Sequence, residues 1–512
     1  MWQIACKHSR QHPVIDLDGF LKRVIFGSGV TFLSLLVIKG MTLINSIIAA
    51  RLLQPADYGA LSIIVNLEGL VVIVAVFGVP VAMIKHISEI SQRDSNLAKS
   101  IGSALIIVIA ITSAITSLIY LALSETIARD IYNNESIITA IRLSALLVLI
   151  ASMNIGLASF VQGCQRIKSL ARVNAAVAIL AQPVTTICIW GFGLNGAILA
   201  LIISNLISIT MLAFVVRRVA GLSFSASKSI LANKGHMKNI FAFSIPLLFS
   251  GLILILAHWI GRTVLATEWG FDSVGDFQIA DNLAQMLLIL SAAMSVPLLP
   301  MISEQDASMP HKVGENVKRL LCITAVAVIP LCILALPFLD SVIRLLYGVE
   351  YSTAYAAAVV MFGAASYRVI CSIVSNVILG TGRVWHAFFL NLIWFFVFLT
   401  VLFMFVGDLG SKGLASAYLA SFGIYVFILS IYFWRSFRVS VIRVLLLCLA
   451  FGSILVIYDE YFMSLDFSGR LIGGAVFSSA MALAGYSLVL DQFERSQIKK
   501  MARGVMRKLR IF

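Results

Sequence analysis

Apolar runs of about 18 or more residues recur along the whole chain, with short polar breaks between them. Such a run is the length that one α-helix needs to cross about 30 Å of bilayer hydrocarbon. In lipid, only helices and closed barrels satisfy every backbone polar group, and a barrel would show short alternating strands instead. We therefore expect an all-α polytopic membrane protein with about 14 transmembrane helices.

The composition excludes a soluble domain. Of the 512 residues, 60% are hydrophobic and 12% are charged, whereas soluble domains are roughly a quarter charged. The seven cysteines are scattered singly, which argues against a disulfide framework, a metal site or a redox site. No cofactor is expected, apart from the coupling ion considered below.

The net charge of +14 reflects topology because the basic residues gather in every second polar break, as in the stretch from Arg166 to Arg172. The alternate breaks carry acids such as Asp57 and Glu125. By the positive-inside rule, both termini are cytoplasmic and the number of spans is even. Nucleic acid is not an expected partner. The basic tail, 491–512, is expected to rest on anionic membrane lipids, with protein binding as the alternative.

An internal repeat constrains the fold further. Five pairs of residues match at one constant offset: Pro80 with Pro297, Gly163 with Gly380, Arg166 with Arg383, Asn174 with Asn391, and Gly196 with Gly413. Because each repeat has an even number of spans, both halves enter the membrane from the same side. This predicts two pseudo-symmetric six-helix bundles, a parallel repeat, followed by two additional helices.

The predicted domain boundaries follow from the repeat and from the polar breaks. We expect a cytoplasmic tail at 1–25, a first six-helix bundle at 26–216, a cytoplasmic linker at 217–239, a second bundle at 240–434, two additional helices at 435–490 and the basic tail at 491–512.

Two cations fall near the middle of predicted spans. Counting the helical rise, Lys39 lies about 21 Å and Arg368 about 20 Å from the outer ends of their spans. A charge at this depth costs at least about 2.5 kcal/mol and marks a functional site by default. The two residues are either separately neutralised structural charges or, as we favour, part of a cationic layer lining a cavity between the halves.

Arg262 and Arg142 lie within two turns of the outer ends of their spans. Snorkelling of the guanidinium to the interface explains each position as well as a place in the cationic cavity does. Arg344 follows Asp340 by four residues, so a local ion pair is expected there.

Glu68 and Asp281 are the acids placed inside predicted spans. Transporters place proton or sodium sites near the bilayer midplane, and either residue is a candidate for H+ or Na+ coupling. Each is equally a candidate for a buried ion-pair partner.

No catalytic set appears in the sequence. The outward breaks are short and hold no paired carboxylates, no Ser/His/Asp set and no phosphate-cradling glycine loop. An enzyme is therefore not expected.

Two stretches carry a family resemblance. The turn LLQPADYG after the first span and the segment RLLYGVEYSTAYAAAVVMF, which begins at Arg344, resemble polysaccharide flippases, including O-antigen and exopolysaccharide flippases. These belong to the multidrug, oligosaccharidyl-lipid and polysaccharide exporter superfamily. The six-plus-six-plus-two arrangement of spans is similar along the whole chain.

The resemblance implies a transporter of the bacterial inner membrane that flips undecaprenyl-diphosphate-linked oligosaccharide from the inner to the outer leaflet by alternating access. The product would be exopolysaccharide, capsule or lipopolysaccharide O-antigen. A polysaccharide polymerase and other assembly proteins are implied as partners. Lys39, Arg368, Arg262 and Arg142 would then contact the diphosphate or an acidic sugar, since fixed cations offset the desolvation of an anion.

Three alternatives stay open. A lipid II flippase shares the superfamily, although its arginine-rich first span is only partly echoed here by Lys39 and Arg51. A multidrug or cation antiporter would need acids in the cavity and usually has twelve spans. A membrane-embedded enzyme of glycan assembly would need an extracytoplasmic loop with carboxylates.

Overall fold

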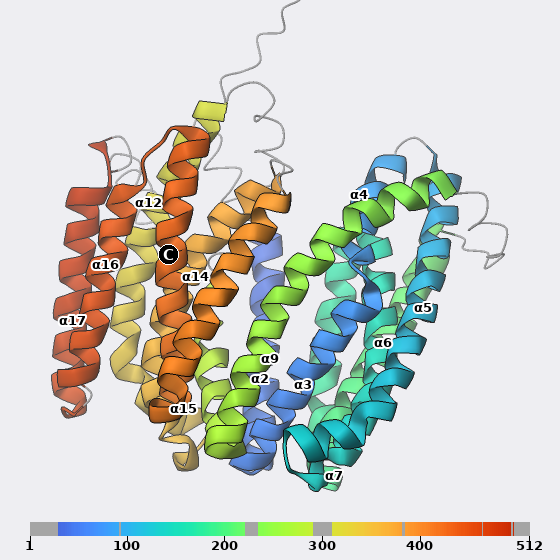
Figure 1. Ribbon diagram of the computed structural model, residues 1–512, viewed down its shortest axis with the longest axis horizontal. Coiled ribbons are helices and arrows are strands. Elements are labelled where there is room, and N and C mark those ends of the chain that lie inside the picture. The colour runs from blue at the N-terminus through green and yellow to red at the C-terminus, as the bar shows by residue number, and fades with distance from the viewer. Residues whose placement is uncertain are drawn as a thin grey trace, which may run out of the picture.

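The structure is a computed structural model that describes residues 29–91, 94–220, 234–289, 310–380, 384–462, 464–492 and 495. Within these ranges, helices follow one another with short turns, and no strand occurs. Figure 1 shows the helices in two bundles side by side, upright on the left and leaning on the right. The prediction of an all-α polytopic membrane protein is confirmed.

The first half of the chain forms the bundle on the right of Figure 1. Pro55 begins α3 because its missing N–H is not needed in the first turn, and Asp94 caps α5 by accepting from two backbone N–H groups. The elements are α2 (Gly29–Leu52), α3 (Pro55–Val76), α4 (Val79–Ser91), α5 (Ser95–Thr126), η1 (Ile127–Ile131), η2 (Glu135–Ile137), α6 (Ile138–Gly163) and α7 (Ile167–Ala220).

The second half forms the bundle on the left, with α16 and α17 at its outer edge. Its elements are α9 (Lys234–Ala284), α12 (Pro310–Ala335), η3 (Leu336–Phe338), α13 (Leu339–Leu346), η4 (Val349–Tyr351), α14 (Ala354–Gly380), α15 (Val384–Phe437), α16 (Ile442–Ile457), η5 (Tyr458–Phe462), α17 (Phe467–Ala484) and η6 (Gly485–Val489).

Three of the long elements, α7, α9 and α15, are helical hairpins. Each contains one glycine with positive φ, Gly193, Gly270 or Gly410, where the chain reverses. In α9, Arg262 bonds to Asp281, nineteen residues later, although a straight helix would separate these residues by about 28 Å. Glycine suits these turns because it has no Cβ to oppose positive φ.

The hairpins of α7 and α15 agree with the predicted repeat. Gly193 (φ 54°, ψ −132°) and Gly410 (φ 55°, ψ −128°) share one backbone conformation and stand at the same offset as Gly196 and Gly413. A Cβ on Gly196 or Gly413 would overlap a carbonyl eight residues earlier. Two of the paired residues, Pro297 and Arg383, lie outside the described residues.

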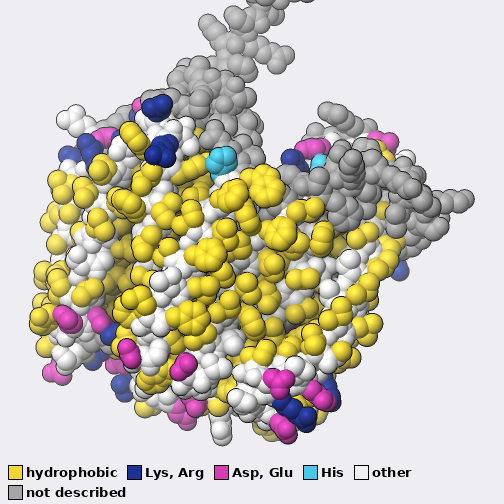
Figure 2. Space-filling view, viewed as in Figure 1, with side chains coloured by type: hydrophobic (Ala, Val, Ile, Leu, Met, Phe, Trp, Pro, Cys, Tyr) yellow, Lys and Arg dark blue, Asp and Glu magenta, His cyan; other side chains and the backbone are white. Residues whose placement is uncertain are grey.

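Ten helices among the described residues are long and apolar enough to cross a membrane, with the three hairpins each counted once. Figure 2 shows a broad hydrophobic band whose charged side chains gather at its two edges. Large apolar side chains are exposed on the surface of the described residues, up to 84% for Trp190, which suits contact with lipid tails. The number of fourteen crossings stays a prediction.

The domain boundaries also stay predictions. The tail at 1–25, most of the linker at 217–239 and most of the tail at 491–512 lie outside the described residues. The helical segment that follows α2 is interrupted: α3 ends at Val76, and Phe77 and Gly78 take positive φ before α4 begins. Pro80 follows because its ring is tolerated in the first turn of a helix.

The two halves meet along α3 and α9, which lie side by side in the middle of Figure 1. A Cβ on Gly59 of α3 would overlap the carbonyl oxygen of Phe271, and one on Gly275 would lie 2.7 Å from the carbonyl oxygen of Pro55. Glycine at these positions therefore permits a close backbone approach. The contact lies at the end of the molecule that is predicted to be extracytoplasmic.

Candidate functional site

A buried ion pair lies where the two halves meet. In α9, Arg262 and Asp281 lie on the two antiparallel segments of the hairpin, and Nη2 of Arg262 lies 2.9 Å from Oδ2 of Asp281. Their side chains are only 3% and 8% exposed, and the guanidinium carbon lies 5.1 Å from the ring centre of Phe277. Arg262 therefore does not snorkel to the interface, and Asp281 is an ion-pair partner in this structure.

Amide and hydroxyl groups extend this pair across to the first half. Arg262 donates to Ser62 of α3 at 3.2 Å and to the amide oxygen of Gln278 at 3.1 Å, while Ser62 also donates to Gln278. Gln278 in turn donates to Asn282 at 2.9 Å. Arg262 also donates to the carbonyl of His258 at 3.4 Å, so its charge is shared among four acceptors.

The same chain of hydrogen bonds reaches α2. Asn282 donates to Ser46 at 2.8 Å and to the hydroxyl of Tyr58 at 3.0 Å, and Ser46 contacts the hydroxyl of Tyr347 at 3.3 Å. We call the connected set the outer clasp: Ser46, Tyr58, Ser62, Arg262, Gln278, Asp281, Asn282 and Tyr347. It joins α2 and α3 to the second half.

A second layer of contacts closes the same end. Arg51, near the end of α2, donates to the carbonyls of Leu345 and Leu346, and Tyr351 donates to the carbonyl of Ala50 at 3.0 Å. Burial raises the pKa of Tyr347 to about 12, so this hydroxyl stays protonated and able to donate at neutral pH. The halves are therefore bound together on the predicted extracytoplasmic side.

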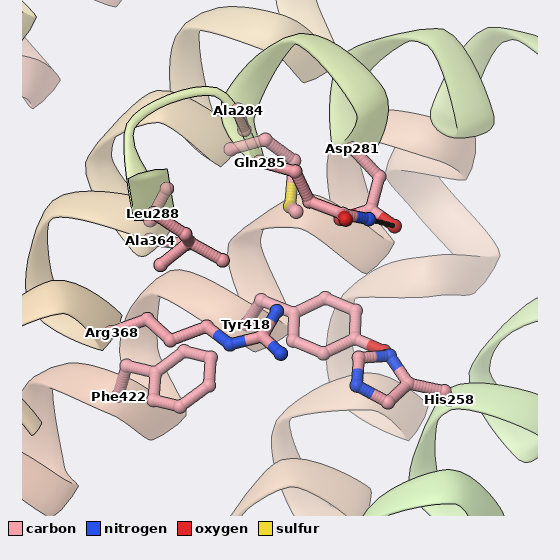
Figure 3. Close-up of a pocket in the computed structure, with 11 residues that line it drawn as sticks. His258, Asp281, Ala284, Gln285, Leu288, Ala364, Arg368, Tyr418 and Phe422 are labelled. Carbon is pink, nitrogen blue, oxygen red and sulfur yellow. Dashed lines mark hydrogen bonds between the residues drawn. The ribbon is translucent and has the colours of Figure 1, made fainter. Parts of the chain in front are cut away.

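A narrow cavity of about 10 Å³, with room for about one water molecule, lies in the second half beside the outer clasp. Figure 3 shows the guanidinium of Arg368, from α14, projecting into it towards Tyr418 of α15. His258 bonds to the Tyr418 hydroxyl at 2.7 Å, and Gln285 donates to Asp281 at 3.2 Å. We call this space the second-half cavity.

Arg368 is the cation of this cavity that has no acid partner among the described residues, whereas Arg262 is held by Asp281. Arg368 is half-buried, and a guanidinium withdrawn from water is costly unless an anion or water compensates it. The second-half cavity therefore offers a cation to an anionic group, although it has to widen to admit one larger than a water molecule.

A larger cavity of about 200 Å³, the first-half cavity, lies on the other side of the outer clasp between α2, α3 and α7. It shares Gln278, Asn282, Ser46 and Ser62 with the outer clasp. Its complete lining is Thr42, Asn45, Ser46, Ala49, Leu61, Ser62, Val65, Asn66, Thr185, Ile189, Ala197, Leu201, Gln278 and Asn282.

The structure separates the other predicted site residues. Lys39 lies on α2 one turn before Thr42, and Glu68 lies on α3; both are half-buried, and neither forms an ion pair with a described residue. Glu68 faces the first bundle, where it interacts electrostatically with Tyr120 of α5. The roles predicted for Lys39 and Glu68 stay predictions.

Arg142 lies away from both cavities. It pairs with Glu125, and both side chains are 49% exposed at the predicted outer ends of α5 and α6. The local pair expected between Arg344 and Asp340 is confirmed, with Nε and Oδ1 2.8 Å apart.

The sequence analysis missed the uncharged members of the outer clasp. Gln278 and Asn282 were detectable, because polar residues at 278, 281, 282 and 285 recur at helical spacing and so share one side of a helix. Ser46, Tyr58 and Tyr347 gave no such signal, since isolated hydroxyl residues are common in membrane helices.

Comparison with protein-family models identifies the family of this chain. Residues 24–305 match the family described as polysaccharide biosynthesis protein. The chain belongs to this family. The flippase resemblance of the two sequence stretches is thereby confirmed, and the family places the chain in the multidrug, oligosaccharidyl-lipid and polysaccharide exporter superfamily. Comparison with curated proteins finds no match.

Several solved structures share the fold of this chain. The lipid II flippase MurJ in an inward closed conformation has a TM-score of 0.64 and 14% identity, covering 90% of this chain and 99% of that chain. The Vibrio cholerae MATE transporter VcmN in the bent form has a TM-score of 0.58 and 17% identity, covering 82% and 97%. A Pyrococcus furiosus transporter of the same superfamily gives 0.60 and 16%, covering 81% and 95%.

Proposed function

We propose that this protein flips undecaprenyl-diphosphate-linked oligosaccharide from the inner to the outer leaflet of a bacterial inner membrane for surface polysaccharide export. The family match over residues 24–305 carries the proposal. The unpaired Arg368 in the second-half cavity supports it, because a lipid diphosphate needs a cation when it leaves water.

Alternating access provides the physical route. The outer clasp and the Arg51 layer hold the two halves together on the predicted extracytoplasmic side. Release of the substrate to the outer leaflet requires these contacts to break while others form on the opposite side. The hydrogen bonds of the outer clasp are individually weak, about 0.5 to 1.5 kcal/mol net, so a bound ligand can shift the balance.

The experiment is mass spectrometry of polyprenyl-diphosphate-linked glycans in a strain depleted of this protein, together with an assay of surface polysaccharide. We expect lipid-linked repeat units to accumulate while surface polysaccharide is lost. Unchanged lipid intermediates and unchanged surface polysaccharide would overturn the proposal.

A second candidate is lipid II flipping, favoured by the match to MurJ across 90% of this chain. Accumulation of lipid II with cell lysis in the same depleted strain would select it. Multidrug export is less well supported, because the acid of the second-half cavity, Asp281, is already paired with Arg262.

The cationic residues offer a direct test of the substrate's charge. We expect Arg368→Gln combined with Lys39→Gln to lower glycan export by at least about tenfold, since a charge-assisted hydrogen bond contributes roughly 1.5 to 3 kcal/mol. The exposed Arg129→Gln, whose partner is Glu135, is the matched control and should export normally. Normal export by a stably inserted double variant would contradict a cationic binding layer.

A further inference from the structure

The first-half cavity and the second-half cavity differ in chemistry although both border the outer clasp. The first-half cavity is lined by eight amide or hydroxyl residues and six apolar ones, with no charged side chain among them. The second-half cavity contains Arg368, Asp281 and His258. The two cavities therefore suit different parts of one ligand, or different ligands.

Several polar groups in the first-half cavity have unused hydrogen-bonding capacity. The amide oxygen of Asn45 is fully buried and has no hydrogen-bond partner among the described residues. Asn66 donates to the carbonyl of Ser62, which leaves its amide oxygen available, and Thr185 is only 5% exposed on the facing wall. Leaving a buried acceptor unpaired costs about 1 to 3 kcal/mol, so a ligand that donates to it gains that amount.

The lining restricts the chemical class of such a ligand. Amides and hydroxyls both donate and accept, as sugar hydroxyls do. An ion would enter without a counter-charge, which is strongly unfavourable.

We propose that the first-half cavity is a binding site for an uncharged sugar of the lipid-linked oligosaccharide, while Arg368 binds the diphosphate on the other side of the outer clasp. This inference rests on the proposed function and adds to it a division of labour between the halves. The sugar donates to Asn45 and Asn66, and Thr185 lies on the opposite wall.

The position of the site links sugar binding to the outer clasp. Gln278 and Asn282 line the first-half cavity, and their amide groups are already bonded within the outer clasp. A sugar hydroxyl that accepts from the amide nitrogen of Asn282 must replace Ser46 or Tyr58, because this nitrogen has two donor hydrogens. A glycosylated lipid thus weakens the contacts that hold the halves together, and a lipid without sugar leaves them intact.

The test compares two lipids bound to the purified full-length protein by native mass spectrometry: undecaprenyl diphosphate, and the same lipid carrying one N-acetylglucosamine. We expect the protein to bind the glycosylated lipid more tightly. Asn45→Ala and Thr185→Val should each weaken that binding by about tenfold, without changing the affinity for undecaprenyl diphosphate. Arg368→Gln should weaken the binding of both lipids.

Thr186→Val is the matched control. Thr186 adjoins Thr185 but is exposed, and it bonds to the carbonyl of Gln182 in its own helix, so neither affinity should change. If thermal unfolding shows that Asn45→Ala or Thr185→Val is not stably folded, Asn66→Ala takes its place in the comparison. Equal affinity of the unaltered protein for both lipids, or equal losses for both in the Asn45 and Thr185 variants, would overturn this inference alone. Failure of the unaltered protein to bind either lipid would overturn the proposed function as well.

Discussion

Arg262 and Arg142 show which properties of a single residue the sequence predicts. Both lie within two turns of a predicted outer helix end, yet Arg262 is buried against Asp281 whereas Arg142 pairs with Glu125 at the exposed edge. Depth in the membrane follows from helical rise. The direction in which a side chain points depends on neighbouring helices, which the sequence of one segment does not specify.

The Arg262–Asp281 pair leads to a prediction about stability. Asp281→Asn leaves a buried guanidinium without a counter-ion, which costs about 3 to 5 kcal/mol for a buried pair. Replacing both residues, as Arg262→Met with Asp281→Leu, removes both desolvation penalties. We therefore expect the single variant to unfold at a lower temperature than the double variant, measured by thermal unfolding in detergent. An unchanged melting temperature in Asp281→Asn would mean that the pair does not stabilise the fold.

At the scale of elements, the packing of α3 on α9 depends on Gly59. A Cβ at this position would overlap a backbone carbonyl of Phe271, which cannot move aside as a side chain can. Overpacking of this kind costs typically about 1 to 3 kcal/mol. We expect Gly59→Ala to loosen the predicted extracytoplasmic side and to raise the labelling of a cysteine at Ser62 by an impermeant thiol reagent about tenfold.

Gly69→Ala is the matched control for Gly59→Ala. It lies on the same helix, and its added Cβ would meet only the end of the Ile255 side chain at 3.3 Å. Labelling should stay near the starting value in this variant. Both measurements use a background without the seven native cysteines. Equal labelling of the two alanine variants would show that Gly59 does not control closure.

The additional helices are attached to the second half by ion pairs at both ends. Lys412 of α15 contacts Asp459 at 2.6 Å near the predicted outer side, and Lys318 of α12 lies 3.8 Å from Asp491 at the other end. Arg443 of α16 also contacts Asp491 at 2.6 Å, which joins the two ends of the additional region to each other. These contacts add to the direct packing of α16 and α17 on α12, although both helices lie outside the repeat.

Asp491 gives a pH-dependent prediction. Its hydrogen bond to Arg443, helped by the charge of Lys318, holds the pKa of the carboxyl below its usual value. The stabilisation is therefore complete above the ordinary aspartate pKa and is lost as the pH falls through the lowered value. Because the pair is half-exposed, we expect a contribution of at most about 1 kcal/mol.

Thermal unfolding of Asp491→Asn beside the unaltered protein tests this expectation. The variant should melt at a slightly lower temperature at pH 7, and the difference should shrink as the pH is lowered. Asp466→Asn is the control, because its side chain makes no capping bond. A difference that persists in acid would mean that the carboxylate charge is not its source.

For the whole molecule, the repeat and the apolar runs were sufficient to predict the helical class, because both follow from local hydrophobicity. The reversal glycines Gly193 and Gly410 fit the repeat, but the contact between halves was not predictable. It depends on Ser46, Tyr58 and Gln278, which are ordinary polar residues until three helices bring them together. The sequence therefore pointed to Arg368, Arg262 and Asp281, whose functional roles stay predictions, and not to the uncharged members of the outer clasp.

Alternating access requires that the outer clasp opens in every cycle, and this gives the last prediction. Ser46 and Asn282 belong to different halves, and their side chains are 2.8 Å apart. A short, cleavable bifunctional thiol reagent should join cysteines placed at both positions in a background without native cysteines. Because the joined halves cannot separate, glycan export should stop and then resume after the reagent is cleaved.

Cysteines at Asn154 and Asn205, whose side chains are also 2.8 Å apart but lie within the first half, should be joined without loss of export. Export that continues through a complete Ser46–Asn282 cross-link would show that this contact stays closed during transport, and the route of the substrate would have to avoid it.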